Sequence, residues 1–148
     1  LLERCPLSVC MCVEVSGEVR SFNNRSGRGN KLIITLFARE LAPSREEAAN
    51  QLNLTGVLCK PPVLRCTPLG RDICDLILAV NRRYGRADYL PCIAWGALAV
   101  SCGELGVGDA VRLEGRLQSR VYRKIADGVC EERTAFEISV MKLERLNP

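Results

Sequence analysis

The sequence contains no histidine, and this absence excludes several classes of enzyme. Without an imidazole, neither a Ser–His nor a Cys–His catalytic dyad can form. Paired carboxylates can serve as acid and base. However, the candidate pairs, Asp72 with Asp75 and Glu131 with Glu132, fall in segments that we expect to be solvated strands and loops. We therefore expect a protein that is not an enzyme.

Long apolar runs are also absent. None approaches the roughly 20 residues that a membrane-spanning helix needs, so no membrane contact is predicted. The first residues carry no basic lead before an apolar stretch, which argues against a signal peptide. Because the chain begins at Leu1 rather than Met, we expect that sequence upstream is missing.

The sequence is rich in cysteine, but its cysteines lack the short spacing that is typical of metal ligands. Zinc sites need ligands grouped at short spacing, and only Cys10 and Cys12 come close to it. No metal or other cofactor is therefore predicted. An odd number of cysteines, most of them inside apolar runs, is typical of reduced thiols that act as small buried apolar groups. The nine are Cys5, Cys10, Cys12, Cys59, Cys66, Cys74, Cys92, Cys102 and Cys130.

Aromatic residues make up only 5% of the chain, and the net charge of +4 is mild. Such a charge permits nucleic-acid binding without demonstrating it. The basic residues are unevenly distributed, with one group at 82–86 and another at 116–124. The groups consist of Arg82, Arg83 and Arg86, and of Arg116, Arg120, Arg123 and Lys124.

The hydrophobic pattern predicts strands in the N-terminal third. Residues 9–22 alternate with the period of two of a half-buried strand. Residues 23–30 form a turn-rich basic loop, and residues 31–39 return as a second strand. Residues 43–50 are interpreted as a linker, where the capping-box spacing of Ser44 and Glu47 indicates one short helical turn.

The rest of the chain is predicted to form strand, strand, strand, short helix, strand and strand. This order fits an all-β protein with an OB-fold, a five-stranded, partly open Greek-key barrel with one short helix. The expected elements are a strand at 52–64 bent or interrupted at Pro61–Pro62, a β-turn at 67–70, strands at 72–83 and 88–95, a helix at 97–105, and strands at 110–124 and 133–144 separated by a loop at 126–132.

An internal repeat relates the two ends of the chain. Val13–Ser21 matches Val111–Ser119, with the glycine, the final serine and the alternation in register. Leu32–Leu41 then parallels Ala135–Glu144. Two strand hairpins can look alike by chance, but the shared register favours duplication.

Duplication would divide the chain into three parts. Residues 1–42 would be the C-terminal hairpin of a preceding, truncated OB domain, residues 43–50 a linker, and residues 51–148 a complete OB domain. Two strands alone cannot bury a face. The hairpin is therefore expected to need upstream strands or another chain as a partner.

Several short stretches have the order and spacing of one known family. They are Leu52–Val57, Thr67–Gly70, Leu76–Arg83, Asp88–Gly96 and Gly108–Arg120. Over residues 50–146 the chain thereby resembles the bacterial single-stranded DNA-binding protein family. The resemblance implies an OB-fold protein of the cytoplasm and nucleoid. It would bind single-stranded DNA without strong sequence preference during replication, recombination and repair.

The resemblance also implies an assembly with four OB folds. Two OB domains per chain would make this assembly a dimer, and one domain per chain a tetramer. The flexible tail with an acidic tip, by which the family recruits partner enzymes, is missing from this sequence, which ends at Leu146-Asn147-Pro148. Replication proteins are therefore a possible class of partner, which the sequence itself does not specify.

The resemblance places base-stacking aromatic residues at Tyr84, Tyr89, Trp95 and Tyr122. Periodicity independently puts Tyr89 and Trp95 on one face of a strand, and Tyr122 on the basic, even-numbered face of 110–124, whose odd positions should pack the barrel. A tyrosine among arginines can hold any base while the cations follow phosphate. The predicted DNA-binding site consists of Tyr84, Tyr89, Trp95, Tyr122, Arg82, Arg83, Arg86, Arg116, Arg120 and Lys124.

Alternatives remain open both for the site residues and for the function. Trp95 also suits a core position, the arginines at 82–86 also suit a merely solvated loop, and Phe22 and Phe37 are more often core than contact. The alternative function is an OB-fold interaction module, such as a primosome-type accessory subunit that acts mainly through protein partners. Salt-sensitive binding to oligo-dT distinguishes the two functions.

Overall fold

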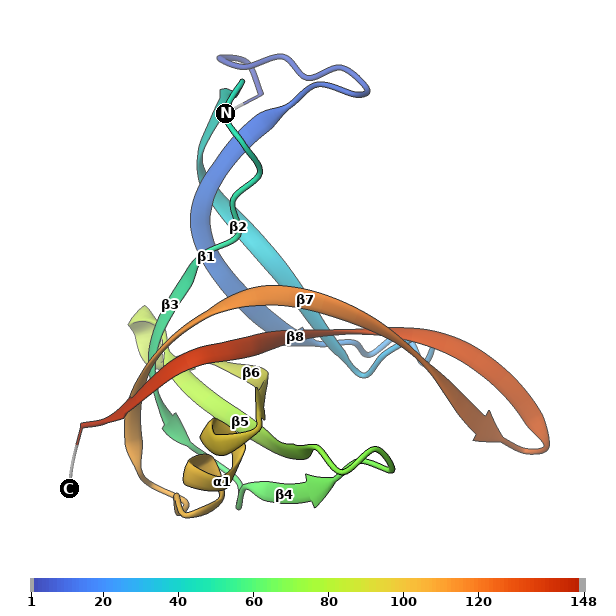
Figure 1. Cartoon of the computed structure of the whole chain (residues 1–148). Coiled ribbons are helices and arrows are strands. Elements are labelled where there is room, and N and C mark those ends of the chain that lie inside the picture. Colours follow the sequence, from blue (N-terminus) through green and yellow to red (C-terminus); the bar gives the residue numbers. More distant parts are fainter. Residues whose placement is uncertain (1, 147–148) are drawn as a thin grey trace.

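The computed structural model describes residues 2–146, which form two β-sheets (Figure 1). One sheet is a two-stranded hairpin of β1 (Val13–Asn23) and β2 (Leu32–Pro43), and the other has six strands. Residue 1 of the predicted first domain and residues 147 and 148 of the predicted last domain lie outside the described part.

Five strands of the larger sheet close into a barrel. The pairing runs β3–β7–β8–β6–β5 and returns to β3, with β6 and β8 parallel and the other pairs antiparallel. The helix α1 lies between β6 and β7, and the short β4 extends the edge of β5. The predicted OB barrel is therefore confirmed. Its elements are β3 (Leu52–Leu58), β4 (Val63–Cys66), β5 (Asp72–Asn81), η1 (Arg83–Gly85), β6 (Ala87–Trp95), α1 (Ala97–Gly103), β7 (Ala110–Ala126) and β8 (Val129–Arg145).

The barrel core is aliphatic and contains cysteine instead of aromatic residues. Leu76, Leu78 and Leu90 are almost fully buried, together with the thiols of Cys74 and Cys92. All seven aromatic side chains of the chain are at least partly exposed. The prediction of Phe22 and Phe37 as core residues is wrong, because they are 50% and 44% exposed on a hairpin whose two strands leave much of their surface open.

The N-terminal hairpin stands on the barrel. Its residues Val19 and Ile34 pack against the barrel core, and its tip reaches the middle of the β7–β8 hairpin (Figure 1). Residues 119–136 of β7–β8, called the arm below, project from the barrel. The prediction that odd residues of β7 pack the barrel fails on the arm, where Val121 and Ile125 are 61% and 77% exposed.

The two hairpins share one irregularity. Each has a β-bulge just before the repeated glycine, at Gly17 and at Gly115. A Cβ atom on either glycine would lie only 2.0 or 2.3 Å from a carbonyl oxygen of the facing strand. The pairing sets Ala38 opposite Gly17 and Val140 opposite Gly115, so the predicted alignment of the second strands is one residue out.

Two local predictions are corrected by the structure, and an alternative left open by a third is decided. The loop at 126–132 is only the two-residue turn Asp127–Gly128, whose positive φ angles of 52° and 74° suit a tight hairpin turn. The segment at 52–64 is interrupted at Pro61–Pro62, one of the two predicted alternatives, since prolines 61 and 62 cannot donate ladder hydrogen bonds. No helical turn forms in the linker, where the Ser44 hydroxyl instead accepts a hydrogen bond from the Glu46 amide (3.2 Å).

The cysteines divide by burial. Cys5, Cys74, Cys92 and Cys102 are buried as predicted, Cys59 is half-buried, and the expectation of burial is wrong for Cys10, Cys12, Cys66 and Cys130, which are exposed. Burial raises the pKa of Cys102 to about 11 and raises the pKa of Cys74 and Cys92 as well. Within residues 2–146, no helix has the length and hydrophobicity to cross a membrane.

Replacing the bulge glycine should destabilise the barrel. Gly115→Ala places a methyl group against the Ser139 carbonyl oxygen, and such overpacking costs about 1–3 kcal/mol of the free energy of unfolding. Gly106→Ala is the matched control, because the nearest atom to its Cβ is 4.0 Å away. Urea unfolding measures both, and equal stabilities would contradict the role of the bulge.

Raising the pH should weaken the fold through the buried thiols. The folded state favours the protonated form of Cys102, so this contribution is fully present below about pH 9 and is lost as the pH rises towards 11. Urea unfolding between pH 8 and pH 10.5 should show falling stability, with a shallower fall in Cys102→Ala. In native protein at pH 8, a thiol reagent should modify the four exposed cysteines first.

Candidate nucleic-acid interface

The outer face of β5 and β6 carries two of the predicted aromatic residues. Tyr89 pairs with Ala79 and Trp95 with Ile73, so both aromatic side chains lie on the face turned away from the core. Tyr89 is 47% exposed. Trp95 is half-buried under the guanidinium of Arg71, which lies 4.9 Å from the ring centroid. The alternative of an ordinary core position for Trp95 is therefore wrong.

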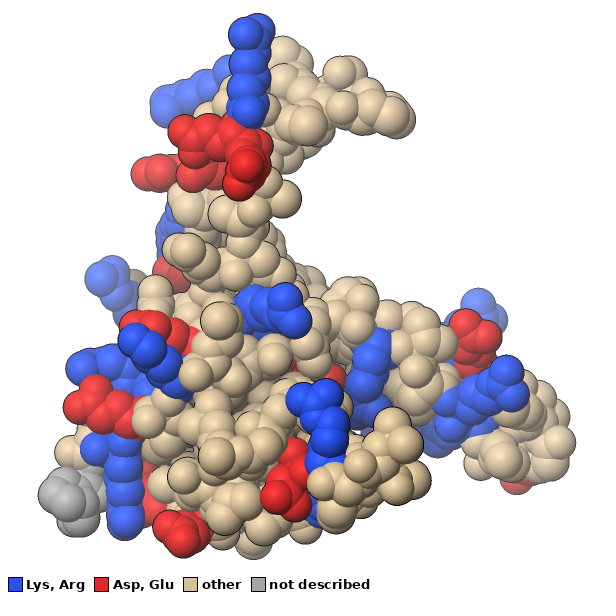
Figure 2. Space-filling model, in the orientation of Figure 1, with Lys and Arg blue, Asp and Glu red and all other residues tan. Residues whose placement is uncertain are grey.

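The site cations predicted on β7 lie at even-numbered positions of this strand. Figure 2 shows Lys and Arg side chains on the projecting arm. Arg120 donates to the buried carboxylate of Glu137 (3.1 Å), which also accepts from Gln118 (3.1 Å). Arg120 is therefore already engaged in an ion pair with a buried carboxylate. Arg116 and Lys124 are exposed and form no ion pair within residues 2–146.

A small open cavity of about 280 Å³ lies where the arm, the tip of the first hairpin and β6 meet. Of the predicted site residues it contains Tyr122 and Lys124. The same cavity is also lined by three residues that the sequence did not indicate, Asn30, Lys31 and Arg133. The basic loop at 23–30 was the available signal, but nothing in the sequence related it to a strand about 100 residues later.

A larger open cavity of about 1340 Å³ lies between the first hairpin, β3 and the β5–β6 turn. Tyr84 in this turn is 98% exposed and has the strained φ of 67°, so its ring projects into solvent. Arginine dominates the lining. The arginines are Arg20 and Arg39 from the hairpin and the predicted Arg82, Arg83 and Arg86 from the turn.

The buried carboxylate of Asp88 joins the first hairpin to the barrel. Its Oδ1 accepts the Ser21 amide (2.8 Å), and its Oδ2 forms an ion pair with the Arg82 Nε (3.0 Å). The Ser21 hydroxyl in turn accepts the Tyr89 amide (2.7 Å). Arg82 therefore has a structural role in the site.

The ten predicted residues do not form one cluster. Six of them line the two cavities, while Tyr89 and Trp95 lie on the outer face and Arg116 and Arg120 on β7. What they share is placement on surfaces that run around the barrel and along the arm. A closed five-stranded barrel with exposed aromatic rings and unpaired cations is the architecture of the OB-fold class, which includes oligonucleotide-binding proteins.

The sequence and structural comparisons define the family within this class. The model of the single-strand binding protein family matches residues 49–146, and the chain belongs to this family, whose members are binding proteins. It is 34% identical over 137 residues to the single-stranded DNA-binding protein of Thermus aquaticus, covering 89% of this chain and 50% of that protein. It is 36% identical over 80 residues to single-stranded DNA-binding protein A of Bacillus subtilis, covering 49% and 46%.

Solved structures agree with the sequence comparison. The crystal structure of the wild-type single-stranded DNA binding protein from Thermus aquaticus superposes with a TM-score of 0.76 at 28% identity. The superposition covers 92% of this chain and 59% of that one. The chain spans about half the length of the curated relatives it matches.

Removing the Asp88 carboxylate should loosen the first hairpin. Asp88→Ala leaves the Ser21 amide and the Arg82 guanidinium without their buried partner, which costs about 3–5 kcal/mol when both partners are fully buried. Since Arg82 is 25% exposed and can rehydrate, we expect about 2 kcal/mol in urea unfolding, with faster exchange of the Ser21 amide. Asp75→Ala, which breaks the surface pair with Arg65, should cost less than about 1 kcal/mol.

Proposed function

We propose that this chain binds single-stranded DNA without strong sequence preference, stacking bases on tyrosine and tryptophan rings while arginine and lysine hold phosphates. The observation that carries the proposal is the absence of aromatic side chains from the core. Burial of an aromatic ring stabilises a fold strongly. A chain that leaves all seven at its surface therefore has another use for them, and single-stranded nucleic acid offers π-faces that any ring can stack on.

The ten residues are proposed to contribute unequally. Tyr84, Tyr89, Trp95 and Tyr122 supply stacking surfaces, and the exposed Arg83, Arg86, Arg116 and Lys124 supply phosphate contacts. Arg82 and Arg120 are already paired with the buried Asp88 and Glu137. Their contribution to binding is expected to be smaller and mixed with effects on stability.

The proposed role is protection of single strands during replication, recombination and repair in the bacterial cytoplasm. The names of the relatives from Thermus aquaticus and Bacillus subtilis support the DNA ligand. No substrate is turned over in this role. Holding a flexible strand requires only stacking and charge.

We further propose that residues 1–42 are the C-terminal hairpin of a preceding OB domain, residues 43–50 a linker, and residues 51–148 a complete domain. The shared bulges at Gly17 and Gly115 support duplication. Ser21 docks on Asp88, whereas Ser119, its counterpart in the repeat, is exposed on the arm. A second barrel would occupy that position in a dimer or tetramer, and gel filtration with and without oligo-dT tests the assembly.

The main test is titration of the protein into fluorescently labelled oligo-dT and into duplex DNA of the same length. We expect preference for the single strand and a steep loss of affinity with salt, because bound cations displace counterions from phosphate. Lys124→Ala should reduce the slope of log affinity against log salt by about 0.7. The fluorescence of Trp95, the single tryptophan, should fall on binding.

Tyrosine truncations locate the binding surface. Loss of a stacked base costs about 1–3 kcal/mol, so Tyr84→Ala, Tyr89→Ala and Tyr122→Ala should each weaken binding by roughly tenfold to a hundredfold. Tyr84→Ala is the cleanest because the ring is 98% exposed and packs on nothing. Phe22→Ala, which removes an exposed aromatic ring outside the proposed site, is the matched control. Equal affinity for duplex and single strand, or unchanged affinity in all three variants, would contradict the proposal.

A further inference from the structure

The tip loop of the first hairpin, residues 24–31, is held in one shape by its own hydrogen bonds. The Asn24 side-chain amide donates to the carbonyl oxygens of Arg28 (2.6 Å) and Asn30 (2.9 Å). The Asn24 carboxamide oxygen accepts the Ser26 amide (3.0 Å), and its backbone amide donates to Lys31 (2.7 Å). Such a loop can present a side chain in a defined direction.

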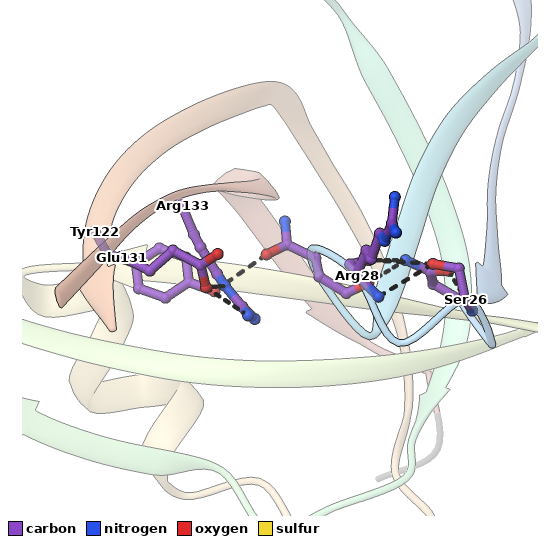
Figure 3. Close-up of polar contacts among 7 residues, drawn as sticks. Ser26, Arg28, Tyr122, Glu131 and Arg133 are labelled. Carbon is purple, nitrogen blue, oxygen red and sulfur yellow. Dashed lines mark hydrogen bonds and ion pairs between the residues drawn. The ribbon is translucent and has the colours of Figure 1, made fainter. Parts of the chain in front are cut away.

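The side chain that this loop presents to the arm is Asn30. Its carboxamide nitrogen donates to the carbonyl oxygen of Thr134, and its carboxamide oxygen accepts the Tyr122 hydroxyl (3.2 Å). Figure 3 shows the Tyr122 ring on the arm beside Arg133 and Glu131, facing the loop that carries Ser26 and Arg28. One asparagine thus uses both of its polar atoms on the other hairpin.

The contact closes one side of the small cavity. Asn30 and Lys31 of the loop line a volume of about 280 Å³ together with Tyr122, Lys124 and Arg133 of the arm. Binding sites for drug-sized ligands begin at about this volume, so the cavity suits a single planar ring. Lys31 and Lys124 are exposed, whereas Arg133 is paired with Glu131 (2.9 Å).

We propose that Asn30 is a positioning residue for DNA binding, which holds the Tyr122 ring so that the cavity between the two hairpins receives one unpaired base. Lys31 and Lys124 hold the adjoining phosphates. This inference rests on the proposed function and deepens it, because it makes the first hairpin part of the binding site. Asn30 acts through Tyr122, since both of its polar atoms are already engaged.

The test compares Asn30→Ala with wild type on two ligands, oligo-dT and an abasic oligonucleotide of the same length. Loss of one hydrogen bond corresponds to about a threefold to tenfold change. We expect Asn30→Ala to weaken oligo-dT binding by this factor and to leave abasic binding unchanged, because only the base needs the ring. Tyr122→Phe removes the same bond from its other end but keeps the Asn30 bond to Thr134, so it should give a loss in the same range. The double variant should show no further loss beyond Asn30→Ala.

Asn50→Ala is the matched control. The Asn50 side chain also forms two hydrogen bonds with β7, donating to the Leu117 carbonyl (2.7 Å) and accepting from the Leu117 amide (3.0 Å). However, Asn50 lies outside both cavities. It should leave the ratio of oligo-dT to abasic affinity at the wild-type value. Should Asn30→Ala fail to fold, Tyr122→Phe provides the same comparison.

The outcomes separate the two proposals. Wild-type protein that binds neither ligand overturns the proposed function. If wild type binds oligo-dT, the positioning role is overturned by unchanged binding in Asn30→Ala and Tyr122→Phe. It is also overturned by equal losses on the two ligands, or by additive losses in the double variant.

Discussion

The carboxylate of Asp88 is the interaction on which the arrangement of the two sheets depends. Strand β6 pairs with β8 only at residues 92 and 93, so the backbone at residues 88 and 89 has no strand on that side within the described chain. Ser21 occupies this position. Its amide donates a hydrogen bond to the Asp88 carboxylate, and its hydroxyl accepts one from the Tyr89 amide. An edge that would otherwise be open to another strand is thereby covered.

This one contact has consequences at both ends of the first hairpin. With Ser21 fixed, the tip of the hairpin lies against the arm, and Asn30 meets Tyr122. Towards the other end, Arg20 and Arg39 face the β5–β6 turn across the large cavity. A two-stranded hairpin is only marginally stable by itself. Docked on the barrel, it contributes one surface to the small cavity and another to the large cavity.

The composition of the core is related to where the aromatic side chains lie. Leucine, isoleucine, valine, alanine and three thiols fill the barrel, and burial raises the pKa of these thiols. The aromatic rings are left for the surface, where Arg71 covers Trp95, and Arg20 and Arg39 flank Phe37. The arginine pairs show that these rings already attract cations and planar groups.

The sequence by itself determined the barrel, because alternation of period two and the turn residues act locally along each strand. It also determined that Tyr89 and Trp95 share a face, since six residues are an even number of strand steps. The bulge at Gly115, the two-residue turn at Asp127–Gly128 and the long arm depended on which strands pair and how far. Only the tertiary structure decided that Asn30 meets Tyr122 and that Asp88 holds Ser21, because contacts across 92 and 67 residues leave no local pattern.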